Sequence, residues 1–300
     1  MPLSAKELFA ARLGNSMLIE LIKAHSKIDP TITEGSEPVD EQRMYSRGLY
    51  AFNTYLRPCL EQYFEWLHAS NEGSNYSYDI TSLNKQHLAG FLNVLCGVSL
   101  PQAMFYFQEL NGDPALKAHI TGLLKSSPFD SAFDANPDYG RRLGWYALIR
   151  SKKPRLVIET GVDKGLGSCV ITAALMANHQ EGFSGTYLGT DINPAAGFLL
   201  QGPYADFGKV LYGDSLESLA ALQQPVDIFI NDSDHSTDYE AREYTLIHSK
   251  LADKAVIFGD NTHCSGALYD YATRYGKRFM FFSEKPEKHW YPGAGIGASW

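Results

Sequence analysis

The chain lacks a long hydrophobic run, and this absence limits the classes of protein to which it can belong. None of its 300 residues lies in an uninterrupted apolar stretch of about 18, the length that crosses a bilayer. We therefore expect no membrane span. The first residues, Met1 to Glu7, also lack the basic start and apolar centre of a secretory signal, so the sequence predicts a cytoplasmic location.

Cysteine and positive charge are both scarce. The four cysteines stand alone, without a Cys-x-x-Cys pair, and a chain of this length needs no disulfide framework. Lys and Arg number 26 against 34 Asp and Glu, which gives a formal net charge of −8. Because phosphate neutralisation needs clustered basic side chains, we expect no nucleic-acid partner. Hydrophobic residues make up 44% and charged residues 20%, which is typical of a folded chain.

The N-terminal half has the apolar periodicity of helices. Apolar residues recur at intervals of three and four over 5–28 and 40–70, and Pro58 should kink or split the second helix. We expect this helical region, 1–135, to form a lid over a substrate pocket or the dimer interface of a homo-oligomer. Shorter helices are predicted near 84–97, 101–110 and 114–125.

From residue 136 onward, short β-rich runs alternate with helical stretches. This alternation predicts right-handed crossovers and an α/β domain over 136–300, a doubly wound and mainly parallel sheet with helices on both faces. In such sheets ligands bind outside the carboxyl ends of the strands. The segment 290–300 fits a final edge hairpin. The predicted strands are 155–159, 186–191, 209–212, 227–231, 255–259 and 278–282, and the predicted helices are 168–179, 238–251 and 266–275.

The first strand runs into a glycine-rich turn. Gly161, Gly165 and Gly167 follow Glu159, and a helix is expected to begin at Ser168. Glycine lets the backbone turn sharply and approach a ligand, and the next helix offers free N–H groups. The spacing differs from the G-x-G-x-x-G of dinucleotide-binding proteins. It resembles the first motif of class I methyltransferases, which implies S-adenosyl-L-methionine as the cofactor and a role for these five residues in binding it.

Acids also end the second and third predicted strands. Asp191 lies about 30 residues after Gly161, a normal distance for one β–α–β step, and a carboxylate there can accept both hydroxyl protons of a ribose. The methyltransferase resemblance places Asp214 and Ser215, after the third strand, beside the adenine. A solvated acid at the end of a strand remains the alternative interpretation of Asp191.

Polar side chains gather after the fourth and fifth strands. The predicted strand 227–231, with an apolar centre, leads into Asp232 and His235, and Asp260 and Asn261 follow the fifth strand. Charged groups at the end of a buried strand are costly unless they are paired or serve chemistry. Oxygen ligands of this type suit magnesium or calcium. Helix capping and a local salt bridge are the alternative for Asp232 and His235.

These two runs resemble those of metal-dependent O-methyltransferases, a group that includes the catechol, caffeoyl-coenzyme A and macrocin-type enzymes. On this resemblance Asp232, Asp260 and Asn261 would bind Mg²⁺ or another divalent cation, with Asp232 also facing the cofactor. His235 would be the general base, where catechol-type enzymes have lysine. The resemblance covers about 138–300 and implies a small substrate with a hydroxyl group, such as a vicinal diol, a sugar or a catechol-like compound.

Other functions stay open at this point. A metal-independent methyltransferase would use Asp260 and Asn261 only to shape its pocket. An NAD-dependent oxidoreductase has a similar sheet, and a non-catalytic binding protein would work through its helical half. Tyr139, Arg141 and Arg142, just before the first strand, are candidates for contact with cofactor or substrate, with a structural role as the alternative.

Overall fold

The computed structural model describes residues 41–129, 134 and 136–300. The predicted helix at 5–28 lies outside these residues. Contacts within the chain divide it into two compact units. Of the described residues, one unit comprises 41–69 together with 288–290, and the other comprises those from 70 to 287 with 291–300. The sequence pattern predicts a different boundary between two parts of the chain, near residue 135.

The first unit contains three consecutive helical segments, α2 (Glu41–Ala51), the π-helical η2 (Phe52–Leu56) and α3 (Arg57–Ala69). The sequence predicts a kink or a split at Pro58, and the structure has a π-helical turn that ends at Leu56, two residues before it. Proline has no N–H to donate, and its ring collides with the carbonyl four residues earlier in an α-helix. Here that position is Thr54, within the wider turn of η2, so the helical path continues through the proline.

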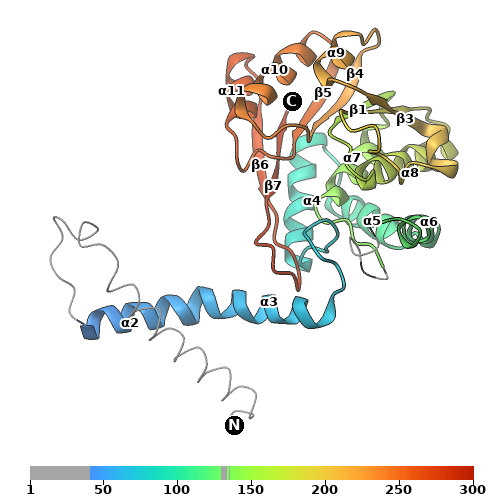
Figure 1. Ribbon diagram of the computed structural model, residues 1–300. Helices are drawn as coiled ribbons and strands as arrows, with labels where there is room; N and C mark the ends of the chain where they lie inside the picture. The colour runs from blue at the N-terminus through green and yellow to red at the C-terminus, as the bar shows by residue number, and fades with distance from the viewer. Residues whose placement is uncertain (1–40, 130–133, 135) are drawn as a thin grey trace. The chain divides into compact units, whose positions relative to one another are not determined.

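The second unit is built on a seven-stranded sheet with the order β3-β2-β1-β4-β5-β7-β6 (Figure 1). The first five strands in chain order pair in parallel, and β7 pairs antiparallel with both β5 and β6. The predicted mainly parallel sheet is therefore confirmed, and β7 forms an antiparallel pair with β6 at one edge of the sheet, with β6 outermost. The strands are β1 (Leu156–Thr160), β2 (Thr186–Asp191), β3 (Gly208–Tyr212), β4 (Val226–Asn231), β5 (Leu251–Gly259), β6 (Phe279–Ser283) and β7 (Gly295–Ser299).

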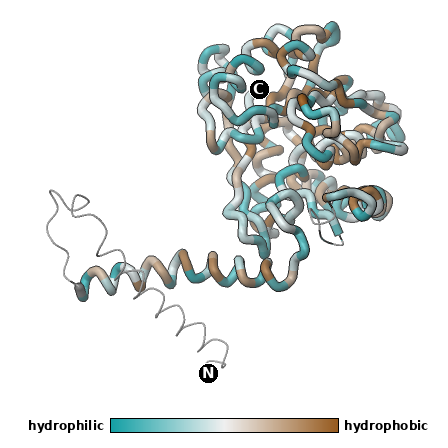
Figure 2. Tube along the Cα trace, in the orientation of Figure 1, coloured by the Kyte–Doolittle hydropathy of each residue, from teal (hydrophilic) through white to brown (hydrophobic). Residues whose placement is uncertain are grey.

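Successive side chains of a strand point to opposite sides of the sheet, and here both sides are apolar. Helices therefore cover both faces. Val157 packs into the apolar cluster of one face, whereas Leu156 and Ile158 pack into the cluster of the other. In Figure 2 the apolar segments run through the interior of this unit, and the outer turns are hydrophilic. The first face carries α4 (Ser82–Cys96), α5 (Leu100–Asn111), α6 (Pro114–Lys125), α7 (Arg142–Lys152) and α8 (Leu166–Gln180), and the second carries α9 (Ser215–Ala220), α10 (Thr237–His248) and α11 (Ala267–Arg274).

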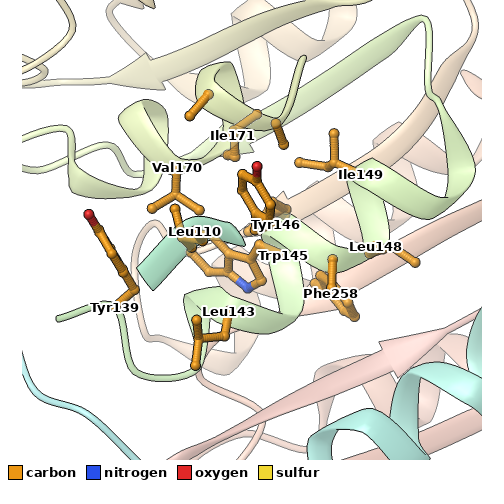
Figure 3. Close-up of a cluster of buried hydrophobic side chains, with 14 of the residues drawn as sticks. Leu110, Tyr139, Leu143, Trp145, Tyr146, Leu148, Ile149, Val170, Ile171 and Phe258 are labelled. Atoms are coloured by element: carbon orange, nitrogen blue, oxygen red, sulfur yellow. The ribbon is translucent and has the colours of Figure 1, made fainter. Parts of the chain in front are cut away.

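Helix α7 lies at the centre of the first face. Its side chains from Arg142 to Arg150 are all buried. Trp145 and Leu143 pack with Leu110 of α5 and Val170 of α8 in the cluster drawn in Figure 3. Within the described residues no single helix is long and apolar enough to span a membrane. Helices α4 and α5 reach that length and apolarity only when taken together, across a bend of 118°.

The ends of β1 and β4 approach closely at one glycine. Gly161 follows β1 with φ of +82°, and a Cβ atom there would lie 1.9 Å from the carbonyl oxygen of Asp232. No other residue type fits this position, because a side chain would meet backbone that cannot give way.

We expect Gly161→Ala to lower the free energy of unfolding by about 3 kcal/mol or more, since positive φ and overlap with neighbouring backbone both cost energy. Gly90, inside α4, is the control, because a Cβ atom there meets nothing within 4 Å. Gly90→Ala should stabilise by roughly 0.5–1 kcal/mol. Urea unfolding measures both changes, and an unaltered stability of Gly161→Ala would contradict the close approach.

Candidate active site

A cavity of about 900 Å³ opens at the carboxyl ends of the parallel strands. The segments that follow β1, β2, β3, β4 and β5 all line it, and its size is that of a small-molecule site. Most of the residues singled out from the sequence thus come together in one place. Those that line the cavity are Glu159, Gly161, Gly167, Asp191, Asp214, Ser215, Asp232, His235, Asp260 and Asn261.

Gly165 and Ser168 do not line the cavity. Gly165 is the N-cap of α8 with φ of +98°, and a Cβ atom there would lie 3.1 Å from Gly197. Ser168 is buried, and its hydroxyl forms a hydrogen bond of 2.8 Å with that of Tyr187. Both residues therefore support the glycine-rich loop from behind.

A buried carboxyl group lies beneath that loop. Glu159 accepts hydrogen bonds from the hydroxyls of Tyr187 and Ser168. Burial raises the pKa of Glu159 to about 8, although the bond from Tyr187 acts in the opposite direction. Gly167 packs directly on it, because a Cβ atom there would lie 2.3 Å from Glu159 Oε1. The carboxyl group is therefore mostly protonated at neutral pH.

Asp191 joins the end of β2 to the glycine-rich loop. Its Oδ2 atom accepts the backbone N–H groups of Val162 at 2.9 Å and Asp163 at 3.0 Å. Its Oδ1 atom accepts the N–H of Asn193 at 2.8 Å. The carboxylate thus holds the loop in place while it faces the cavity.

A carboxyl group that the sequence did not point to fixes the cavity wall at the ends of β3 and β4. Glu243 of α10 is buried and accepts hydrogen bonds from the side chains of Ser215, Asn231, Ser233 and Thr160. Burial raises the pKa of Glu243, and these four bonds act against that rise. The carboxyl group therefore fixes Ser215 and the segment after β4 relative to each other.

Asp260 is bound by an arginine. Arg141 Nε donates to Asp260 Oδ1 at 2.5 Å, and Nη2 donates to Oδ2. Arg141 Nη1 donates to the Tyr78 hydroxyl at 2.7 Å and to Glu284 Oε1 at 3.3 Å. The side chains of Arg141, Asp260 and Glu284 are only 12%, 1% and 0% exposed. Each buried charge in this cluster thus has an opposite charge beside it, as burial requires.

Asp232 and Asp260 both line the cavity, and their carboxyl groups interact. Burial and the negative charge of Asp260 raise the pKa of Asp232 well above its ordinary value. Burial also acts to raise the pKa of Asp260, but the Arg141 guanidinium overrides it and holds that pKa below its ordinary value. The proton of the pair therefore resides on Asp232.

The three predicted metal ligands, Asp232, Asp260 and Asn261, are neighbours in the cavity wall. Arg141 already binds both oxygens of Asp260, however. A divalent ion about 4 Å from a guanidinium is repelled by roughly 8 kcal/mol at an effective dielectric constant of about 20. In this arrangement the residues do not fit such an ion. Among the described residues, no group of three or more His, Cys, Asp or Glu side chains is arranged to hold a metal.

Arg142 faces the cavity beside the glycine-rich loop. Its guanidinium lies over the rings of Tyr76 at 5.4 Å and Trp145 at 5.6 Å. Its Nε atom is buried without a hydrogen-bond partner in the described part of the chain. A buried guanidinium N–H fits a carboxylate, and S-adenosylmethionine carries one on its methionyl end. Asp191, farther along the wall, suits the ribose, so the residues present fit this cofactor.

Residues 158–262 match a family model described as a methyltransferase domain. This segment contains the predicted cofactor and metal residues and His235, whereas the candidates Tyr139, Arg141 and Arg142 precede it. The predicted methyltransferase is confirmed. A search of curated proteins finds no match to the chain.

Several solved methyltransferase structures are similar in fold. The Podospora anserina methyltransferase PaMTH1, bound to S-adenosylhomocysteine (SAH), is 14% identical over 65% of this chain and 92% of its own, with a TM-score of 0.46. The Streptomyces achromogenes O-methyltransferase TomG, in complex with S-adenosylmethionine, is 17% identical over 65% and 93%, with a TM-score of 0.47. The Bacillus cereus O-methyltransferase, in complex with SAH, is 15% identical over 71% and 96%, with a TM-score of 0.40.

The raised pKa of Glu159 predicts a pH-dependent stability of this methyltransferase. The folded pKa of about 8 exceeds the ordinary 4.5, so the stabilisation by the neutral form is complete below pH 4.5. Between these values, the free energy of unfolding should fall by up to about 1.4 kcal/mol per pH unit. Glu159→Gln cannot ionise and should escape this fall, so its advantage over the wild type should grow from pH 5 to pH 8.

Glu181→Gln is the control for this measurement. The hydrogen bonds from Arg150 and Lys153 lower the pKa of Glu181 to about 2, so its charge does not change between pH 5 and pH 8. Urea unfolding at several pH values measures both variants. An equal pH dependence of Glu159→Gln and the wild type would show that Glu159 is ionised in the fold.

Proposed function

We propose that this methyltransferase uses S-adenosylmethionine and transfers the methyl group to a hydroxyl oxygen of a small molecule. The cavity at the carboxyl edge of the sheet carries the proposal, because it combines groups suited to each part of that cofactor. Arg142 offers to the methionyl carboxylate an N–H that has no partner among the described residues, and Asp191 offers acceptors to the ribose. Asp214 and Ser215 lie at the end of β3, where the adenine is expected.

The reaction is a displacement at carbon, so the protein has to position the acceptor and remove its proton. When bound, the cofactor supplies a methyl group on a positively charged sulfur. That methyl group would pass to the acceptor oxygen and leave neutral SAH, while the hydroxyl proton would go to a base of the protein. His235, exposed in the loop after β4, faces the cavity and is the proposed base for that proton.

The predicted magnesium ion takes no part in this proposal. Arg141 binds both oxygens of Asp260, and that contact supports the metal-independent alternative among small-molecule methyltransferases. The 900 Å³ cavity suits a small substrate beside the cofactor. A cytoplasmic location and a homo-oligomer formed through residues 1–135 stay predictions from the sequence.

Isothermal titration with S-adenosylmethionine and SAH tests the cofactor. We expect both ligands to bind and NAD not to bind. Asp191→Asn should weaken SAH binding by about 10- to 100-fold, because a hydrogen bond to a charged acceptor is lost. Asp227→Asn is the matched control, since Asp227 also accepts backbone N–H groups, those of Arg155 and Leu156, but at the other end of the sheet. If the folded chain binds NAD but does not bind SAH, the oxidoreductase alternative is favoured.

The proposed base is tested once a screen of hydroxyl compounds with radiolabelled methyl donor has found an acceptor. His235→Gln should lower kcat by about 10²- to 10⁴-fold, because the proton acceptor is removed. His263 lines the same cavity from the loop after β5 and is the matched control. His263→Gln should leave kcat near that of the wild type. The opposite result, in which only His263→Gln loses turnover, would assign the proton transfer to His263.

A further inference from the structure

The proposed function gives no role to the positive charge of Arg141, which lies at the ends of β4 and β5. Arg141 presents Nε and Nη2 to the two oxygens of Asp260, which is the forked geometry that guanidinium groups form with carboxylates. The Arg141 side chain is 12% exposed and lines the cavity. The group that neutralises Asp260 therefore also faces the space for the ligand.

A second carboxylate, that of Glu284, binds the Nη1 atom of Arg141. Arg141 Nη1 donates to Glu284 Oε1, and the Tyr78 hydroxyl donates to the same oxygen at 2.9 Å. The backbone N–H of Ala294 donates to it as well, at 2.9 Å. The Glu284 side chain is 0% exposed. Arg141 cannot swing away from Asp260 to admit a metal ion without leaving Glu284 as a buried and uncompensated charge.

We infer that the Arg141 guanidinium is the resident cation of this site, in the place that the O-methyltransferase resemblance assigns to a divalent metal. Its catalytic meaning rests on the proposed methyl transfer. The guanidinium supplies the positive charge that stabilises the acceptor oxygen as its proton leaves. Chelation of a metal ion suits two adjacent hydroxyls, whereas a fixed cation in the cavity wall requires only one oxygen on the acceptor.

Binding of Mn²⁺ to the full chain, stripped of metal with EDTA, tests this inference. Electron paramagnetic resonance counts free Mn²⁺ with and without SAH. We expect the wild type to bind none at this site. Arg141→Gln should gain one Mn²⁺ per chain, because Asp232, Asp260 and Glu284 lose their cation. Arg141→Lys is the matched control, since it keeps a positive charge and should bind none. Circular dichroism verifies that each variant is folded.

One Mn²⁺ bound by the wild type and lost in Asp232→Asn would overturn the inference. A folded Arg141→Gln variant that gains no Mn²⁺ would overturn it too. If Arg141→Gln does not fold, Mn²⁺ binding to the wild type is the test. A Mn²⁺ ion bound through Asp232 overturns the inference, and a wild type that binds none supports it.

Titration of SAH in EDTA separates this inference from the proposed function. A folded wild type that binds no SAH would defeat the proposed cofactor, whatever the Mn²⁺ result. If the wild type binds SAH in EDTA, and in the separate Mn²⁺ experiment binds an ion through Asp232, the proposed cofactor stands and only the role of Arg141 is overturned. Any acceptor found by screening should be methylated at the same rate in EDTA and in Mg²⁺.

Discussion

A guanidinium buried at the edge of a sheet is stable only if opposite charges surround it. Arg141 meets this condition with Asp260 after β5 and Glu284 after β6, residues that lie 119 and 143 positions away along the chain. The same contacts hold the start of α7 at the cavity. Helix α7 then runs as the buried centre of one face of the sheet (Figure 3), so the ion pair joins the hydrophobic core to the site.

The sequence predicts most of the second unit, because its parallel strands are short β-rich runs and the helices α8, α10 and α11 alternate with them. It misses α7, and the reason is physical. A helix buried on all sides has no exposed polar face to mark it, and in α7 the buried Arg142 and Arg150 interrupt the apolar run. It predicts an edge hairpin at 290–300 but not the insertion of β7 between β5 and β6, because Gly295 and Gly297 have no side chain whose polarity would indicate burial. Only pairing with β5 and β6 defines that strand.

The strand-end acids could be predicted because the carboxyl ends of parallel strands meet at one edge. Their partners could not, since these come from distant segments. Glu243 is the exception that left a signal. It shares one helical face with Glu240, Tyr244 and Ile247, all buried, so the pattern itself contains a carboxyl group at a core position. Such a group has to accept several hydrogen bonds, and Glu243 accepts them from the residues that shape the wall.

The balance of charge in the cavity limits which group can act as a base. The positive charge of Arg141 keeps Asp260 ionised and paired with its guanidinium. The charge of Asp260, together with burial, keeps the proton on Asp232, and burial keeps Glu159 mostly protonated at neutral pH. A protonated carboxyl group cannot take a proton, and a carboxylate held by two guanidinium N–H groups is a weak base. These three carboxyl groups are therefore poor bases, which supports the proposed role of His235, whose imidazole extends from the loop that begins at Asp232.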